Sequence, residues 1–81
     1  MRLDKFLKVS RLIKRRTVAN TVSDMGRVLV NSAQAKPAKQ LKVGDIIEIE
    51  YANHTEKVEV VIVPNGNVSV QEASTLYRVI E

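Results

Sequence analysis

The chain has 81 residues, no cysteine and a formal net charge of +4 at pH 7. A chain of this length has room for one small hydrophobic core, so we expect a single domain over residues 1–81. The lack of cysteine excludes disulfides, thiolate metal sites and thiol catalysis. The N-terminal sequence has no apolar run long enough for a signal peptide or a membrane span, so we expect a cytoplasmic protein.

The charge is distributed unevenly along the chain. Residues 1–42 contain eleven Lys and Arg against two Asp, a net +9, whereas residues 43–81 contain two cations against seven acids, a net −5. Such polarity orients a protein in the field of a polyanion, and phosphate neutralisation supplies most non-specific affinity for nucleic acids. The composition favours a nucleic-acid partner, with a merely solvated basic face as the alternative.

The first predicted element is a short helix over about residues 4–10. Leu3, Phe6 and Leu7 recur at the i, i+3, i+4 spacing of an amphipathic helix. Cations gather on the opposite arc of this helix: Lys5, Lys8 and Arg11. We therefore expect one face to be buried and the other to be basic.

A second helix is predicted over residues 16–25, ended by Gly26 in a left-handed C′ conformation. Its apolar residues lie on one face, which we expect to pack on the core: Val18, Val22 and Met25, with Ala19 beside them. Its polar residues lie on the far, exposed face: Arg16, Asn20 and Ser23.

The rest of the chain has the two-residue period and β-branched content of strands. We predict strands at residues 27–31, 46–51, 56–63 and 77–80, an irregular basic segment at 34–45, and a short helix at 71–76. The expected fold class is α+β, with two short N-terminal helices packed on a small, mostly antiparallel sheet.

The cations Lys14, Arg15 and Arg16 stand at the start of the second helix, where the macrodipole favours negative charge. Stability alone does not select cations there. The free N–H groups of a helix start bind anions, and guanidinium forks strengthen a phosphate site. This segment is our strongest candidate for a phosphate-binding surface.

Catalysis is disfavoured by the available side chains. His54 is the only histidine and has no partner at the spacing of a metal site or a catalytic triad, and no Gly-rich phosphate loop is present. We expect no enzyme activity, no metal and no cofactor. Acidic strand residues leave open an adaptor that docks a basic protein: Glu48, Glu50, Glu56 and Glu59.

Only three aromatic residues are present, so a platform that stacks successive single-stranded bases is not expected. Binding should then depend on backbone and shape, which favours structured RNA read through phosphates and 2′-hydroxyls. A DNA-binding helix-turn-helix over the first 26 residues is the weaker alternative, because its second helix would offer few side chains to bases.

The run "RLDKFLKVSRLIKRRTVANTVSDMGRVLVN", followed by "VGDIIEI", resembles the RNA-binding domain family named after ribosomal protein S-four, with its alpha-L motif of two helices. The resemblance covers residues 2 to about 50, so residues 1–50 would be the module and 51–81 a β-rich C-terminal extension. Two positions depart from the family pattern: Arg15 replaces the usual helix cap, and Asn31-Ser32 replaces an Asn-Gly turn.

The resemblance implies an RNA-facing surface, with Arg16 at the motif arginine. The implied contacts are Arg2, Lys5, Ser10, Arg11, Arg15 and Arg16, to which the charge pattern adds Lys8, Lys14, Lys36 and Lys39. Leu3, Asp4, Ala19 and Gly26 fall on structural positions of the family.

The N-terminal run also resembles the stand-alone RqcP family of bacterial ribosome-associated quality control, related to the fifteen-kilodalton heat-shock protein. This resemblance implies binding to large ribosomal subunits obstructed by peptidyl-tRNA, with contacts to rRNA and tRNA. It further implies an RqcH-type tRNA-recruiting factor as partner in template-free C-terminal alanine tailing, and we expect a monomer. A ribosome-assembly or rRNA-modification accessory is the alternative.

Overall fold

The computed structural model describes residues 1–66 and 68–80 and has the expected α+β architecture. The helices are α1 (Leu3–Val9), α2 (Arg16–Asp24) and α3 (Val70–Ala73). The strands are β1 (Val28–Val30), β2 (Ala33–Gln34), β3 (Ile46–Glu50), β4 (Thr55–Val60) and β5 (Tyr77–Val79). None of the helices in these two ranges is long and apolar enough to cross a lipid bilayer.

The five strands form one antiparallel sheet in the order β2-β1-β3-β4-β5. Because side chains alternate along a strand, one face is apolar and faces the helices. Its buried residues are Val28, Val30, Ile47, Ile49, Val58 and Val60. The sequence suggested a module over residues 1–50 and an extension over 51–81. The sheet contains strands from both parts, because β4 pairs directly with β3.

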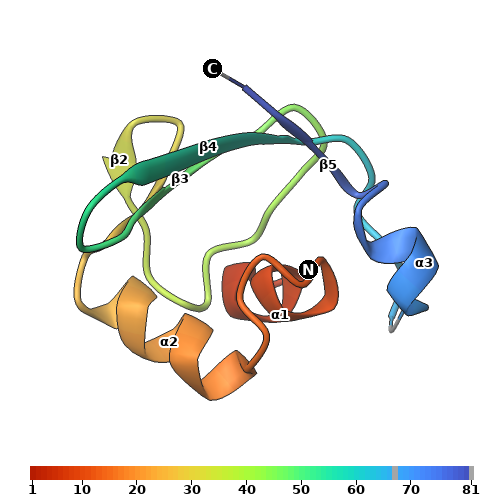
Figure 1. Ribbon diagram of the computed structural model, residues 1–81, viewed down its shortest axis with the longest axis horizontal. Coiled ribbons are helices and arrows are strands. Elements are labelled where there is room, and N and C mark those ends of the chain that lie inside the picture. Colours follow the sequence, from red (N-terminus) through yellow and green to blue (C-terminus); the bar gives the residue numbers. More distant parts are fainter. Residues whose placement is uncertain (67, 81) are drawn as a thin grey trace.

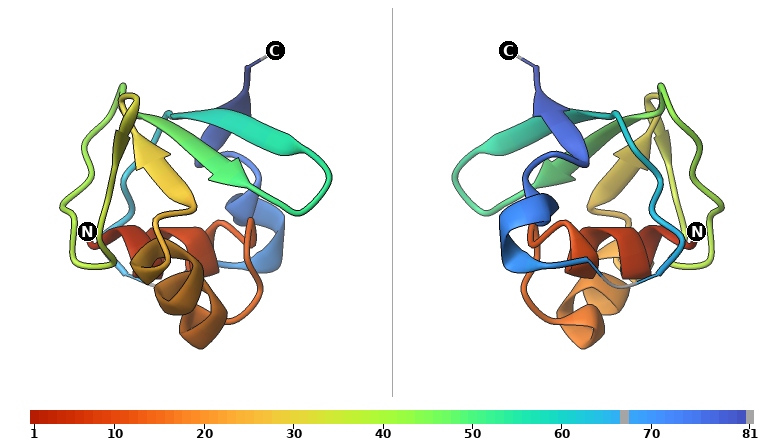
Figure 2. Two further views of the ribbon diagram at one scale, coloured as in Figure 1. Left: turned by 90° about the vertical axis from the view of Figure 1, so that its left-hand side faces the viewer. Right: turned by 90° about the vertical axis from the view of Figure 1, so that its right-hand side faces the viewer.

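The helix α1 lies beneath the apolar face of the sheet, with α2 and α3 on opposite sides of it (Figures 1 and 2). Leu3, Phe6 and Leu7 are fully buried, as the helical spacing predicts. Lys5 and Lys8 occupy the arc left open to solvent. The start and end of both N-terminal helices lie within two residues of the predicted limits.

The buried face of α2 differs from the prediction. Val18 and Met25 are 46% and 60% exposed, whereas Ala19 and Ser23 are fully buried. Ala19 and Ser23 are one helical turn apart, and their small side chains let α2 pack closely on its neighbours. The expectation that Val18 and Met25 anchor this helix, and that Ser23 is exposed, is therefore wrong.

The irregular segment after β2 is held tightly against α1. The backbone N–H of Leu3 donates to the Lys39 carbonyl at 2.8 Å, and that of Asp4 donates to the Pro37 carbonyl at 3.2 Å. These contacts satisfy N–H groups that the first turn of a helix leaves free. The short strand β2, at the start of this segment, was not expected from the sequence.

The β1–β2 hairpin closes through a two-residue turn at Asn31 and Ser32, which have φ of 53° and 72°. Positive φ at both positions is the signature of a type I′ turn, which usually requires Asn-Gly. The Asn31 side chain donates to the buried Asp45 carboxylate at 3.1 Å and accepts from the Ile46 N–H at 3.0 Å. The turn therefore forms without glycine, because Asn31 fastens it to the neighbouring hairpin.

A buried carboxylate joins α1 to α2. The Asp4 side chain is 3% exposed and accepts hydrogen bonds from Arg2 Nε at 3.2 Å and Asn20 Nδ2 at 3.3 Å. Arg16 Nε lies 3.5 Å from Asp4 Oδ2, and the Lys5 backbone N–H donates to Asp4 Oδ1 at 2.8 Å. Burial alone would raise the pKa of Asp4, but the Asn20 hydrogen bond and the Arg16 and Arg2 charges lower it overall.

Replacing Ser32 by Gly should stabilise the fold by about 1 kcal/mol, because glycine adopts positive φ without the steric cost paid by serine. Urea unfolding followed by circular dichroism measures the change. Ser74→Gly is the matched control, since Ser74 has φ of −73° and should lose stability on the same substitution. Equal effects at both positions would contradict the turn assignment.

Stability should fall as the pH drops below about 4, the ordinary pKa of Asp. The unfolded chain then binds protons more tightly than the folded one, whose Asp4 pKa is lowered. Asp4→Asn should cost about 1–3 kcal/mol at pH 7 by weakening the buried acceptor, and should flatten this acid limb.

Urea unfolding at pH 7 and pH 3 tests both statements. Asp24→Asn is the control, since the Asp24–Lys36 pair is exposed on both sides and contributes little. If the Asp4→Asn protein is as stable as the parent at pH 7, the Asp4 carboxylate does not stabilise the contact between α1 and α2.

Candidate nucleic-acid interface

The predicted cations surround the α1–α2 pair rather than one helix end. Arg2, Lys36 and Lys39 belong to the end of the molecule where α1 begins, because the 36–40 segment bonds to the first turn of α1. Lys5 and Lys8 follow the open arc of α1, and the remainder lies in the connection to α2 and at its start: Arg11, Lys14, Arg15 and Arg16. We refer to these exposed and half-exposed cations together as the helix-pair surface.

Ser10 is the exception among the predicted contact residues. It is 2% exposed, and its hydroxyl donates to the Leu7 carbonyl at 3.2 Å at the C-terminal end of α1. The side chain is therefore not available to an RNA backbone in this structure. Its role here is to finish the helix and support the turn that follows.

Arg11 follows Ser10 with φ of 63°, in the left-handed region. This region costs a residue with a Cβ roughly 1–2 kcal/mol, which is why glycine or asparagine usually ends a helix in this way. The Arg11 side chain is exposed. The left-handed conformation thus places an exposed cation directly after the C-terminal end of α1.

The start of α2 lacks the usual capping side chain. Arg15 occupies the N-cap position with an extended backbone, and it makes no side-chain cap bond to the described residues of the helix. The first N–H groups of α2 are thus left without that partner, next to Lys14, Arg15 and Arg16. This geometry suits an anion, as the sequence pattern indicated.

Arg16 is fixed rather than free. Its side chain is 46% exposed, while its Nε lies 3.5 Å from the buried Asp4 carboxylate. It borders a shallow groove of about 440 Å3 between the two helices, lined also by Asp4, Thr17, Asn20 and Thr21. A cation held on one side and exposed on the other can bind a phosphate with little loss of side-chain entropy.

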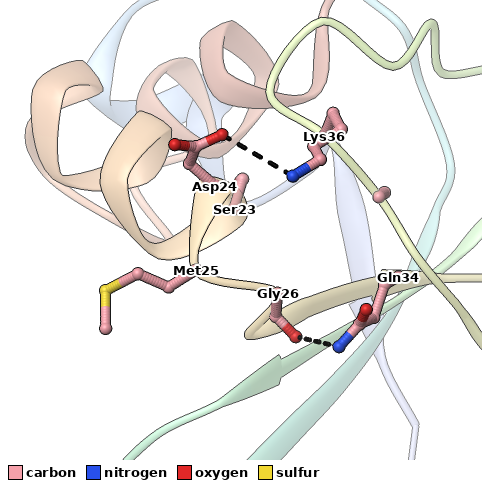
Figure 3. A pocket seen from close by; sticks show the side chains of 7 residues that line it. Ser23, Asp24, Met25, Gly26, Gln34 and Lys36 are labelled. Carbon is pink, nitrogen blue, oxygen red and sulfur yellow. Dashed lines mark hydrogen bonds and ion pairs between the residues drawn. The ribbon is translucent and has the colours of Figure 1, made fainter.

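A second cavity, of about 270 Å3, lies between the end of α2 and the segment after β2 (Figure 3). Lys36 forms an exposed ion pair with Asp24 across it at 3.8 Å, and the Gln34 amide donates to the Gly26 carbonyl at 3.2 Å. Gly26 has φ of 77°, and a Cβ there would lie 2.7 Å from Gln34 Nε2. The positive φ is what favours glycine here, since the exposed end of the Gln34 side chain can move away from a Cβ.

The acidic strands do not form one acidic face. On the outer face of the sheet Glu48 is opposite Lys57, and Glu59 is paired with Arg78. Glu56 is two residues from the buried Val58 in β4, so it lies on the opposite, inner face of the sheet. Burial and the nearby charge of Glu56 raise the pKa of Tyr51. This arrangement gives the adaptor alternative no support.

His54 is placed in the β3–β4 turn. Its ring stacks on Tyr51 with centroids 4.8 Å apart, and its Nδ1 lies 2.8 Å from Asn53 Oδ1. No group of three potential metal-ligating side chains occurs in residues 1–66 and 68–80. The stacked histidine has the contacts of a turn residue rather than of a catalytic one.

The sequence did not identify Asn20, Thr17 and Thr21 as neighbours of the candidate site. Asn20 lies on the exposed face of its helix, as expected. Its hydrogen bond to Asp4 could not be predicted without knowing how the two helices cross. The spacing of Arg16 and Asn20, one turn apart, was the available signal.

The chain is similar to known proteins in sequence and in fold. A family model described as the S4 domain matches residues 1–47. An RQC P-site tRNA stabilizing factor from Halalkalibacterium halodurans is 51% identical over 98% of this chain and 89% of its own length. A protein of the same name from Streptococcus pneumoniae is 46% identical over 99% of this chain and 90% of its own.

The trimeric structure of heat shock protein 15 from Vibrio cholerae superimposes with a TM-score of 0.89 at 29% identity. The match covers 99% of this chain and 81% of that one. The family model covers more than half of the chain, and the two sequence relatives are similar over nearly all of it. The chain therefore belongs to the S4 domain family.

Proposed function

We propose that this chain is an RNA-binding factor of ribosome-associated quality control. It binds large ribosomal subunits obstructed by peptidyl-tRNA and contacts rRNA and tRNA through the helix-pair surface. The observation that carries this proposal is the uncapped start of α2, with Arg16 held by Asp4 beside an open groove. The names of the two sequence relatives, which are similar to this chain over nearly its whole length, support the same role.

The contribution of each cation follows from its position. Arg16 and Arg2 are oriented by one carboxylate, so they present fixed donors to phosphate oxygens. Arg11 adds charge just past the C-terminal end of α1, about 10 Å from its start for a seven-residue helix. Lys14 and Arg15 add charge directly before Arg16 at the start of α2. The surface is long enough to contact more than one phosphate of a folded RNA.

The protein acts by binding, without catalysis, in the cytoplasm on ribosomes. In this role it holds the tRNA so that an RqcH-type factor can extend the stalled chain by alanine tailing. Whether it works as a monomer stays a prediction, which sedimentation of the purified chain will decide.

Arg16→Ala should reduce co-sedimentation with peptidyl-tRNA-bearing large subunits by about tenfold to a hundredfold, the range expected for losing charged hydrogen bonds. Arg16→Lys should restore only part of the binding, because lysine keeps the charge but not the fork. Lys57→Ala, on the outer face of the sheet, is the matched control.

Undiminished binding of Arg16→Ala would show that the interface is elsewhere. A preference of the parent protein for precursor particles over stalled subunits would instead favour the assembly alternative.

Affinity for RNA should also fall steeply with salt. If about five phosphates are contacted, log K should decrease with log salt at a slope near −4 to −5, measured by fluorescence anisotropy on a labelled RNA stem-loop. The Lys57→Ala protein should keep this slope. A flat salt response would contradict phosphate binding by the helix-pair surface.

A further inference from the structure

The groove beside Arg16 contains more than a phosphate-binding cation. It is lined by Thr17, Asn20 and Thr21 from successive turns of α2, with the Asp4 carboxylate at its inner side. Phosphate binding explains Arg16 but assigns nothing to these three neutral side chains. Their hydrogen-bonding states indicate what they can bind.

Thr21 is set as an acceptor. Its hydroxyl donates to the Thr17 carbonyl at 3.0 Å, so the proton is already used within the helix. A hydroxyl has one proton and two lone pairs. The lone pairs of Thr21 Oγ1 are what this side chain offers to a ligand in the groove.

Asn20 also offers an acceptor. Its Nδ2 lies 3.3 Å from Asp4 Oδ2, and an ionised carboxylate only accepts, so the amide nitrogen must face it. This orientation leaves the carboxamide oxygen as an acceptor and the second N–H of Nδ2 as a donor. Asn20 and Thr21 thus place two acceptors next to the donors of Arg16.

This pairing of donor and acceptors distinguishes between nucleic-acid backbones. Phosphate and ring oxygens of the backbone only accept hydrogen bonds, whereas the 2′-hydroxyl of RNA can donate one. Acceptors facing a DNA backbone would lose water without gaining a partner. We propose that the α1–α2 groove is a ribose-recognition subsite, in which Arg16 binds a phosphate while Thr21 and Asn20 accept from 2′-hydroxyl groups.

This inference rests on the proposed RNA-binding function and adds to it the means of selecting RNA. Thr17 lines the same groove, and its hydroxyl can rotate to extend the row. The subsite would read sugar rather than base, which matches a protein that recognises folded RNA by shape.

The test compares two stem-loops of one sequence, RNA and 2′-fluoro RNA, by fluorescence anisotropy. Fluorine keeps the A-form sugar but removes the hydroxyl donor. The parent protein should bind the fluoro stem-loop about tenfold more weakly than the RNA. Thr21→Val, which keeps the shape of threonine, should lose affinity for the RNA alone and so bring the two affinities close together.

Thr75→Val is the matched control, because the Thr75 hydroxyl donates to the Glu72 carbonyl in α3, away from the groove. This control should keep the tenfold difference. Urea unfolding of each variant verifies that the fold is intact, and a Thr21→Ser protein should recover the parent's difference.

Two results would overturn the inference. One is that the parent and the Thr21→Val protein prefer RNA over 2′-fluoro RNA by the same factor. The other is a loss of affinity that follows inosine substitution of guanines rather than 2′-fluorination, which would mean that the acceptors contact base amino groups. If Arg16→Ala weakens binding to both stem-loops while Thr21→Val changes nothing, the proposed function stands and only the ribose subsite fails.

Discussion

The buried Asp4 carboxylate is the interaction on which the arrangement of the helix pair depends. It lies in the first turn of α1 and reaches Asn20 and Arg16 in α2, so it adds a polar link between two short helices that also pack through buried residues such as Ala19. It also places a negative charge between Arg2 and Arg16, whose repulsion would otherwise oppose a compact basic surface. One side chain therefore links the two helices and orients Arg2 and Arg16.

The surface so formed departs in several places from what stability alone would select. Arg15 stands where a capping side chain would satisfy the start of α2, and Arg11 adopts a backbone conformation that favours glycine. Both departures put an exposed cation next to the helix pair. Ser32 is strained in the same sense, but it lies in a hairpin turn outside that surface, and nothing in the structure explains its selection over glycine.

Local patterns predicted the secondary structure well because each element is short and its periodicity is clear. The helices, four of the five strands and the Asn31-Ser32 turn were found from the sequence, which also marked Arg15 as standing where a capping side chain is usual. The buried face of α2 was not, because the pattern ranks Val18 and Met25 above Ala19 and Ser23 by hydrophobicity. Close packing of helices instead favoured small residues. The strand β2 and the Asp4–Asn20 bond depend on contacts between distant segments, which periodicity does not contain.

Binding of RNA where α1 and α2 meet can be tested residue by residue. The most direct measurement is the change of backbone amide chemical shifts when an RNA stem-loop is titrated into the labelled protein. The account predicts the largest changes from Arg11 to Thr21, with little change on the outer face of the sheet around Glu48 and Lys57. Changes concentrated on that outer face, with the helix pair unaffected, would contradict it.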